Sequence, residues 1–329
     1  MDIRDYLSDD GQVALALCSA FARPVADPGG PEPLKLSEWN QLERRVRESC
    51  FQRPAALPGR SAEELAGELR LPLNEAERLA LLLERAGQLA LELEALFARG
   101  IWAVTRTDEW YPARLRDSLK HQAPAVLFGA GEIQKLGGGV AVVGSRNIDE
   151  AGAAFAREVG RRAAAARLPV VSGGARGSDR LAMEGALEAG GLTVGVLADS
   201  LERTIRQPDL RQLLLDGQLV FLTPYSPNAG FSVGGAMGRN KVIYGLAEFA
   251  VVVSSDFQTG GTWAGATEAL KAGWCPVFAR DGDQVPKGNK ELLKLGATPL
   301  NTADLPRVED LRDWLKTRAR SRLVEQDLF

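Results

Sequence analysis

Short apolar runs alternate with helical stretches through the middle of this chain. The runs are Val140–Val143, Val170–Ser172, Thr193–Leu197, Leu219–Leu222, Ala250–Ser254 and Pro276–Phe278. Strands this short and this uniformly apolar are typical of a parallel sheet that is buried on both faces, because the connections between parallel strands place helices on each face. The pattern therefore predicts an α/β fold with a Rossmann-like, mostly parallel sheet and helices on both faces.

A helical pattern precedes this region, up to about residue 98. Ser61 with Glu64, and Asn74 with Glu77, each place a capping oxygen three residues before a carboxylate, which predicts two helix starts. At Ile101–Thr105 the pattern changes to a β-branched run, which predicts a strand that leads into the sheet.

The last part of the chain has a sequence pattern that differs from both of these regions. After Arg280 we expect a polar loop, a short helix near Asn289–Leu295 and a basic final helix. The predicted division is a helical N-terminal domain at 1–98, an extended Rossmann-like domain at 99–300, and a basic helix and tail at 301–329.

Composition limits the environment and the partners. The 329 residues carry a net charge of -3, so any contact with nucleic acid must come from a local basic patch. The three cysteines form no CxxC pair, which argues against a disulfide framework. No apolar stretch approaches the roughly 20 residues that span a bilayer. We therefore expect a cytoplasmic protein with no membrane contact.

Three glycine-rich loops follow predicted strands, at Gly144–Asn147, Ser172–Asp179 and Thr259–Thr262. In open α/β sheets the ligand site lies beyond the carboxyl ends of the strands, where helix N-termini present free N–H groups to an anion. One such loop alone is explained equally well as a tight turn. The coincidence of three predicts a site for phosphates.

Arginines strengthen the prediction of a phosphate site. Arg146, Arg176 and Arg239 should all lie near the same edge of the sheet. The planar guanidinium group suits phosphate oxygens and can stack on bases. We expect that Arg146 and Arg239 can be replaced with loss of nucleic-acid binding but without unfolding. For Asp179 we favour capping of its helix, or pairing with an arginine, over catalysis.

Signals of catalysis are few. The single histidine, His121, lies upstream of the main sheet, and there is no HExxH motif, no GxSxG motif and no clustered set of metal ligands. Glu268 could face the predicted pocket, although a position on the solvent side of its helix is the simpler interpretation. We assign no catalytic residue, metal site or cofactor, and we favour an accessory protein over an enzyme.

Several longer motifs occur in a characteristic order. They are VAVVGSRN at Val140–Asn147, SGGARGSD at Ser172–Asp179, GRNKVIYGLAE at Gly238–Glu248 and GGTWAGATEAL at Gly260–Leu270. In content and order they resemble the DNA-processing protein A (DprA/Smf) family. The resemblance implies a Rossmann-like core that binds single-stranded DNA in a basic pocket, acts as a homodimer, and loads the RecA recombinase during natural transformation or related recombination.

The resemblance also implies which residues touch the DNA. Arg239-Asn240-Lys241 is similar to an arginine-asparagine-arginine element of the family, with its last arginine replaced. The predicted DNA- and phosphate-binding residues are Gly144, Ser145, Arg146, Ser172, Gly173, Gly174, Arg176, Gly177, Arg239, Asn240, Lys241, Gly260, Gly261 and Thr262. Met183 stands where the family usually has histidine, and we expect no C-terminal winged-helix domain, so the chain resembles a divergent member.

Two other functions remain open on the same fold. A nucleotide phosphoribohydrolase is one, because the Gly260–Thr262 turn followed by Glu268 is similar to a motif of lysine-decarboxylase-like enzymes, although their spacing is not reproduced. A sensor of a nucleotide signal is the other.

Overall fold

The computed structural model describes residues 5–21 and 30–326, which form two compact units. The first unit comprises Met1–Tyr111, His121–Ala130 and Thr223–Ala229. The second comprises Pro112–Lys120, Gly131–Leu222 and Gly230–Phe329. Residues 327–329 of the predicted C-terminal tail lie outside the described residues. No helix in the described ranges has the length and apolar character needed to cross a membrane.

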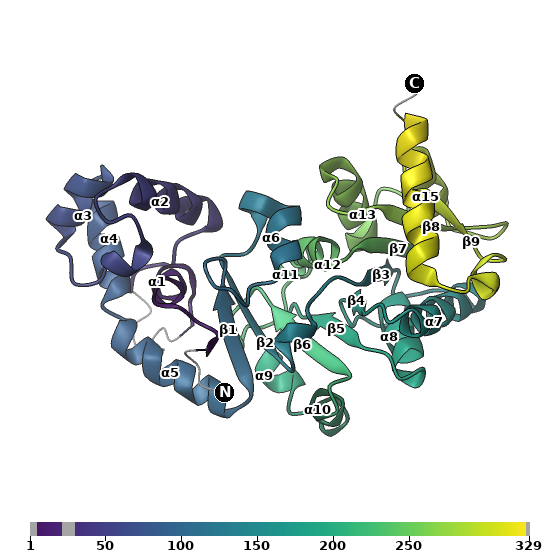
Figure 1. The fold of residues 1–329 in the computed structure, drawn as a ribbon, viewed down its shortest axis with the longest axis horizontal. Helices are drawn as coiled ribbons and strands as arrows, with labels where there is room; N and C mark the ends of the chain where they lie inside the picture. Colours follow the sequence, from purple (N-terminus) through teal and green to yellow (C-terminus); the bar gives the residue numbers. More distant parts are fainter. Residues whose placement is uncertain (1–4, 22–29, 327–329) are drawn as a thin grey trace. The chain divides into compact units, whose positions relative to one another are not determined.

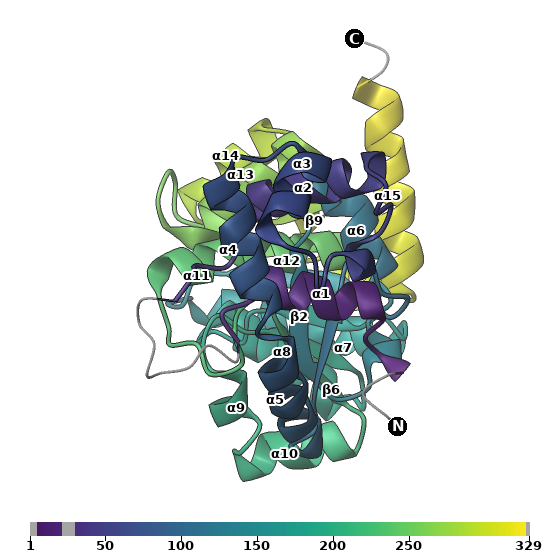
Figure 2. The same cartoon turned by 90° about the vertical axis from the view of Figure 1, so that its left-hand side faces the viewer.

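Five helices make up most of the first unit. They are α1 (Asp9–Cys18), α2 (Leu36–Glu48), α3 (Ala62–Leu69), α4 (Leu73–Leu83) and α5 (Ala86–Ala98). Helix α1 lies in the middle of the group, where Leu15 and Leu17 are fully buried (Figure 2). The helical pattern in the sequence is thereby explained by one shared core.

The two predicted helix starts have different outcomes. The Ser61 hydroxyl accepts a hydrogen bond from the Glu64 N–H at 3.2 Å, and the Glu64 carboxylate accepts one from the Ser61 N–H at 3.0 Å, so this start is confirmed. The start at Asn74 is wrong. Helix α4 begins at Leu73, with Pro72 in an extended conformation at the cap position, so Asn74 lies inside the first turn of the helix.

The first unit also contains an antiparallel pair of strands, β1 (Ile101–Thr105) and β2 (Val126–Ala130), in which Ala103 lies opposite Phe128. The strand predicted at Ile101–Thr105 is confirmed.

Seven strands build the sheet of the second unit. They are β3 (Val140–Gly144), β4 (Val170–Ser172), β5 (Thr193–Val196), β6 (Leu219–Thr223), β7 (Phe249–Ser254), β8 (Val277–Asp281) and β9 (Thr298–Asn301). Their order is β6-β5-β4-β3-β7-β8-β9, and neighbouring strands pair in parallel. The predicted Rossmann-like, mostly parallel sheet is confirmed.

The order of the strands changes direction between β3 and β7. From β3 the chain proceeds outward through β4, β5 and β6, and then returns to place β7 on the other side of β3. The connections after β3 and β7 therefore leave toward opposite faces and open a crevice at their carboxyl ends, which is where open α/β sheets bind ligands.

Helices cover both faces of this sheet. They are α6 (Ala113–Leu119), α7 (Glu150–Ala165), α8 (Ser178–Glu188), α9 (Leu201–Thr204), α10 (Pro208–Leu215), α11 (Val233–Gly238), α12 (Asn240–Leu246), α13 (Gly260–Ala272), α14 (Lys287–Lys294) and α15 (Leu311–Gln326). Figure 1 shows α7 and α8 on one side of the central strands, with α12 and α13 on the other. The continuous apolar runs in the sequence reflect this double cover.

Strand β9 was not expected from the sequence, which predicted no strand after β8. It pairs only with β8, with Ala279 opposite Pro299. Its residues alternate between buried and exposed, unlike the other strands of the sheet. An edge strand tolerates proline because it needs no hydrogen-bond donor on its free side. Since proline is otherwise rare in strands, the sequence pattern does not predict a strand here.

One buried amide fastens the carboxyl ends of β7 and β8. Asn289 of α14 is fully buried, and its Oδ1 accepts a hydrogen bond from the Ser255 N–H at 2.8 Å. Its Nδ2 lies 3.1 to 3.4 Å from the carbonyl oxygens of Val252, Val253 and Arg280. A single buried side chain thus hydrogen-bonds to main-chain groups at the ends of both strands.

Candidate nucleic-acid interface

The glycine-rich loops after β3 and β4 lie in direct contact. The Ser178 hydroxyl, at the start of α8, donates to the carbonyl oxygen of Ser145 at 3.2 Å. Gly177 has a φ of 92°, and a Cβ at this position would come within 2.6 Å of the carbonyl oxygens of Ser145 and Arg146. Glycine is required at position 177 both by the backbone angle and by this close approach.

The third loop leads into α13. Thr259 occupies the position before the helix, and its side chain makes no capping hydrogen bond. Gly260 has a φ of 79°, and Asn240 Nδ2 donates to the Gly261 carbonyl oxygen at 3.1 Å. The side chain of Asn240 therefore holds the turn, while the first N–H groups of α13 carry no side-chain cap and suit an anion.

These loops surround a cavity of about 700 Å³ at the crevice between β3 and β7, which we call the phosphate cradle. Its lining residues include Gly144, Ser145, Arg146, Asp179, Arg239, Asn240, Tyr244, Gly260, Gly261 and Thr262. The structure thus brings together residues that the sequence places more than a hundred positions apart.

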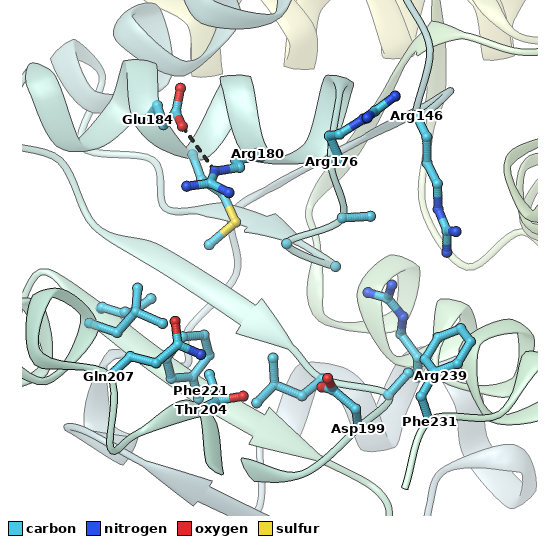
Figure 3. A pocket seen from close by; sticks show the side chains of 18 of the residues that line it. Arg146, Arg176, Arg180, Glu184, Asp199, Thr204, Gln207, Phe221, Phe231 and Arg239 are labelled. Carbon is cyan, nitrogen blue, oxygen red and sulfur yellow. Dashed lines mark hydrogen bonds and ion pairs between the residues drawn. The ribbon is translucent and has the colours of Figure 1, made fainter. Parts of the chain in front are cut away.

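A second cavity of about 890 Å³, which we call the side cavity, adjoins the cradle. Gly173, Gly174 and Arg176 line the side cavity only. Arg146, Ala175, Phe231 and Arg239 line both cavities. Figure 3 shows Arg146 and Arg239 extending into the same opening, from the loop after β3 and from the end of α11.

Arg239 is more enclosed than the sequence suggested. Its side chain is 8% exposed, and its Nη1 donates to the carbonyl oxygen of Val196 at 2.8 Å. The expectation that Arg239 can be replaced without unfolding stays a prediction, but its burial and this hydrogen bond indicate that the replacement costs stability. Arg146 is exposed, and its replacement removes no contact of this kind.

Arg176 and Asp179 have specific partners in the second loop. Arg176 Nη2 donates to Asn147 Oδ1 at 2.7 Å, which links the second loop to the first. Asp179 is 7% exposed, and its Oδ2 accepts a hydrogen bond from the Gly173 N–H at 3.2 Å. Burial raises the pKa of Asp179, and the positive charge of Arg239 acts in the opposite direction. The carboxyl group thus stabilises the loop and faces an arginine.

Three predicted residues line neither cavity, and one of them is Gly177, which lies against Ser145 and Arg146. Ser172 is fully buried, and its hydroxyl donates to the carbonyl oxygen of Val142 at 2.6 Å, which ties β4 to β3. Lys241 Nζ lies 2.8 Å from Glu268 Oε1, and it also lies 5.8 Å from the centre of the Trp274 ring. In this arrangement the ammonium group of Lys241 is directed to α13 and not to the cradle.

Tyr244 is a lining residue that the sequence analysis did not single out. It is 1% exposed, and its hydroxyl has no hydrogen-bond partner among the residues that the structure describes. Burial raises its pKa well above the ordinary value, so the hydroxyl stays protonated and able to donate. Its position four residues after Asn240 was the available signal, because residues at this spacing share one face of a helix.

Metal ligands do not gather at this site. Within residues 5–21 and 30–326, no group of three or more histidine, cysteine, aspartate or glutamate side chains could hold a metal ion.

Comparison with known proteins gives a consistent result. The family described as DNA recombination-mediator protein A matches residues 102–308. DNA processing protein DprA of Bacillus subtilis is 27% identical over 220 residues, which cover 64% of this chain and 72% of that protein.

Two solved structures share the fold. DNA processing protein A from Streptococcus pneumoniae superposes with a TM-score of 0.61 at 23% identity, covering 83% of this chain and 98% of that one. The protein of the same name from Helicobacter pylori, whose structure addresses its binding of single-stranded DNA, gives a TM-score of 0.52 at 21% identity, covering 67% and 96%.

The matched residues extend over more than half of the chain and include all three glycine-rich loops of the cradle. This chain therefore belongs to the DNA recombination-mediator protein A family.

Proposed function

We propose that this chain binds single-stranded DNA through backbone phosphates held at the phosphate cradle. The observation that carries the proposal is the convergence of Arg146 and Arg239 with three glycine-rich loops at the point where the strand order changes direction. The Helicobacter pylori relative, which binds single-stranded DNA, supports the same function.

The chemistry of the cradle suits a phosphodiester. The N-terminus of α13 offers main-chain N–H groups and the positive end of a helix dipole. Arg146 adds an exposed guanidinium group that can donate two parallel hydrogen bonds to phosphate oxygens. A flexible single strand can lower its backbone into a concave site, whereas a stiff duplex cannot follow such a surface without a deformation cost.

The wider role is part of the same proposal. We propose that the chain acts as a homodimer in DNA recombination or DNA uptake and loads the RecA recombinase in the cytoplasm. Membership of the recombination-mediator family supports this role.

The two nucleotide-based alternatives have less support. Glu268, on which the phosphoribohydrolase interpretation depends, is paired with Lys241 and lines neither cavity. A sensor of a free nucleotide would use the same cradle, so it must be separated from DNA binding by experiment.

Fluorescence anisotropy with labelled oligonucleotides tests the proposal. Single-stranded and duplex oligonucleotides of equal length are titrated at two salt concentrations, with a mononucleotide as competitor. We expect tighter binding of the single strand, with an affinity that falls as salt rises, because each neutralised phosphate releases counterions. The proposal fails if no oligonucleotide binds, and a mononucleotide that binds in its place would identify a nucleotide sensor.

A further inference from the structure

A glycine-rich segment, Gly230–Gly238, forms one wall of the phosphate cradle, and we call it the glycine flap. Its residues Phe231, Val233, Ala236 and Met237 line the cradle. None of the residues of the flap is buried, although its last 6 residues form helix α11. A segment with so little buried surface opens at a low cost in free energy, so this wall of the cradle is held only weakly in one conformation.

The flap exposes large apolar side chains. Among the described residues eight such side chains are exposed, and three of them lie in the flap, namely Phe231 at 56%, Val233 at 70% and Met237 at 48%. Val233 and Met237 are four residues apart on α11, so they share one face of that helix. Grouped apolar side chains that remain in contact with water commonly mark a binding surface. The flap therefore has a surface suited to cover a ligand.

Two glycines of the flap are not required by packing or by the backbone. Neither Gly230 nor Gly234 has a positive φ, and a Cβ at either position would meet no atom of the described chain within 4 Å. Gly173 and Gly177, in contrast, lie against other atoms of the site. What glycine adds at positions 230 and 234 is backbone freedom, which is useful where a segment has to change its conformation.

The flap is fixed at its carboxyl end. Its last residue precedes Arg239, which is buried and donates to the Val196 carbonyl oxygen. Phe231 lies beside Arg239 at the opening that both cavities share (Figure 3). Rotation of the backbone at Gly230 and Gly234 would therefore carry the apolar side chains across the mouth of the cradle, while the arginine stays in place.

A bound single strand is the occupant that this surface fits. When its phosphates are directed into the cradle, the strand turns its sugar rings and base faces outward, and these are its least polar parts. The apolar side chains of the flap are the part of the cradle wall that can cover them. A protein partner would have to reach the same side chains through the mouth of the cradle, which the strand itself occupies.

We propose that the glycine flap closes over the bound strand and packs Phe231, Val233 and Met237 against its outward side. This inference rests on the proposed function, and it adds a conformational step that follows binding. The strand then leaves only after the flap reopens. The flap thereby controls how long a strand stays bound, and has much less influence on how fast the strand arrives.

The rate of dissociation tests closure. Protein that carries labelled oligothymidine is mixed with excess unlabelled oligothymidine in a stopped-flow instrument, and the fall in anisotropy gives the rate. In the variant that combines Gly230→Ala with Gly234→Ala, we expect dissociation faster by on the order of tenfold, because the alanines remove backbone freedom that closure needs. The free energy of unfolding of this variant should stay equal or rise slightly, since alanine also restricts the unfolded chain.

Gly87→Ala is the matched control for the glycine variant. Gly87 of α5 likewise has no positive φ, and a Cβ there would meet no described atom within 4 Å. Gly87 lines neither cavity, so Gly87→Ala should release oligothymidine at the wild-type rate.

Loss of the apolar cover provides a second arm. We expect Phe231→Ser to release oligothymidine faster by on the order of tenfold, as for the loss of one partly buried apolar side chain. Leu215→Ser is its matched control, because Leu215 is 73% exposed and lines neither cavity. The association rates of both variants should stay close to that of the wild type. Val233→Ser replaces Phe231→Ser if circular dichroism shows that the latter does not fold.

Each other outcome overturns a stated part. Wild-type dissociation rates in the glycine variant and in Phe231→Ser would overturn closure. Faster dissociation in Phe231→Ser alone would show a fixed contact with the strand and no movement of the flap. A dimer of the wild type that light scattering finds lost in Phe231→Ser, without DNA, would assign the apolar side chains to a second copy of this chain. Failure of the wild type to bind oligothymidine would overturn the proposed function itself.

Discussion

Gly173 lies directly against the guanidinium group of Arg239, and any side chain at position 173 would overlap it. The same guanidinium donates to the carbonyl oxygen of Val196 at the end of β5. A glycine in the second loop and a carbonyl group of the next strand thus fix the arginine that both cavities share.

Replacement of Gly173 by alanine should displace Arg239. Gly173 is not among the residues with positive φ, so the effect arises from the collision and not from the backbone angle. We expect a loss of about 1–3 kcal/mol in the free energy of unfolding, as for other overpacked sites, together with weaker oligonucleotide binding. Urea unfolding and anisotropy measure the two effects.

Gly190→Ala is the matched control for this variant. Gly190 has a φ of 74° with open space around it, so alanine there should cost about 1 kcal/mol and leave binding unchanged. Wild-type stability and binding in Gly173→Ala would show that Arg239 is free to move.

Arg146→Ala should weaken binding without loss of stability, because Arg146 is exposed. We expect the slope of log affinity against log salt to become shallower by about 0.7, the value for one phosphate of a single strand. Arg161→Ala is the control, since the side chain of Arg161 is 53% exposed and lines neither cavity. An unchanged slope in Arg146→Ala would remove this residue from the proposed interface.

Arg239→Ala should behave differently from Arg146→Ala. Its removal takes away the donor to the Val196 carbonyl oxygen in a buried place, so we expect a loss of about 1–3 kcal/mol in the free energy of unfolding. Thermal denaturation and urea unfolding measure the loss. A variant as stable as wild type would show that the Val196 carbonyl does not depend on this arginine.

Asp179→Asn should change how stability depends on pH. Burial raises the pKa of Asp179 above the ordinary 3.8, so the folded state holds this proton more tightly than the unfolded state. The contribution of the protonated Asp179 carboxyl group to the free energy of unfolding is fully present below pH 3.8. It is lost as the pH rises through the raised pKa. The free energy of unfolding of Asp179→Asn, relative to that of the wild type, should therefore increase as the pH rises. Above the raised pKa this difference should stay constant. Parallel curves from about pH 4 to about pH 8 would contradict a raised pKa.

Lys241→Ala should affect DNA binding less than Arg146→Ala. The sequence assigns Lys241 to the DNA-binding set, but its ammonium group pairs with Glu268. We expect an affinity change of less than about twofold, since a partly exposed ion pair contributes little. A loss as large as that of Arg146→Ala would show that the ion pair opens when DNA binds.

Asn289→Ala should destabilise the second unit. It removes the partner of the Ser255 N–H and of carbonyl groups on β7 and β8, all in a fully buried place. We expect a loss of about 2–4 kcal/mol in the free energy of unfolding, measured in urea. Lys290 is an exposed neighbour on α14, so Lys290→Ala should leave the free energy of unfolding unchanged.

The sequence predicted the sheet well because its strands are buried on both faces. Continuous apolar runs at β3 to β8 leave little ambiguity once helices separate them. Strand β9 was missed since an edge strand with Pro299 lacks this signal. The start of α4 was misplaced because Asn74 and Glu77 have the spacing of a cap, whereas the helix follows Pro72 and begins at Leu73, two residues earlier than a cap at Asn74 would give.

The site was predictable only in part. Glycines that follow strands indicate where a phosphate can approach, and the structure places Gly144 and Gly260 in the lining of one cavity, while Gly177 lies against the first loop. The direction of a long side chain is set by tertiary neighbours, so the pairing of Lys241 with Glu268 could not be predicted. The Phe221 ring, which lines the side cavity, lies close to Gly195 of β5, and this contact depends on the register of two strands.

The hydrogen bond from Arg239 to Val196 has a consequence for how this protein can vary among relatives. Positions that touch usually change together, because a new side chain at one requires an adjustment at the other. A main-chain carbonyl group is the same for every residue, so position 196 can exchange one strand-forming residue for another while the arginine keeps its partner. Covariation between aligned sequences will therefore not reveal this contact, although it positions the arginine that both cavities share.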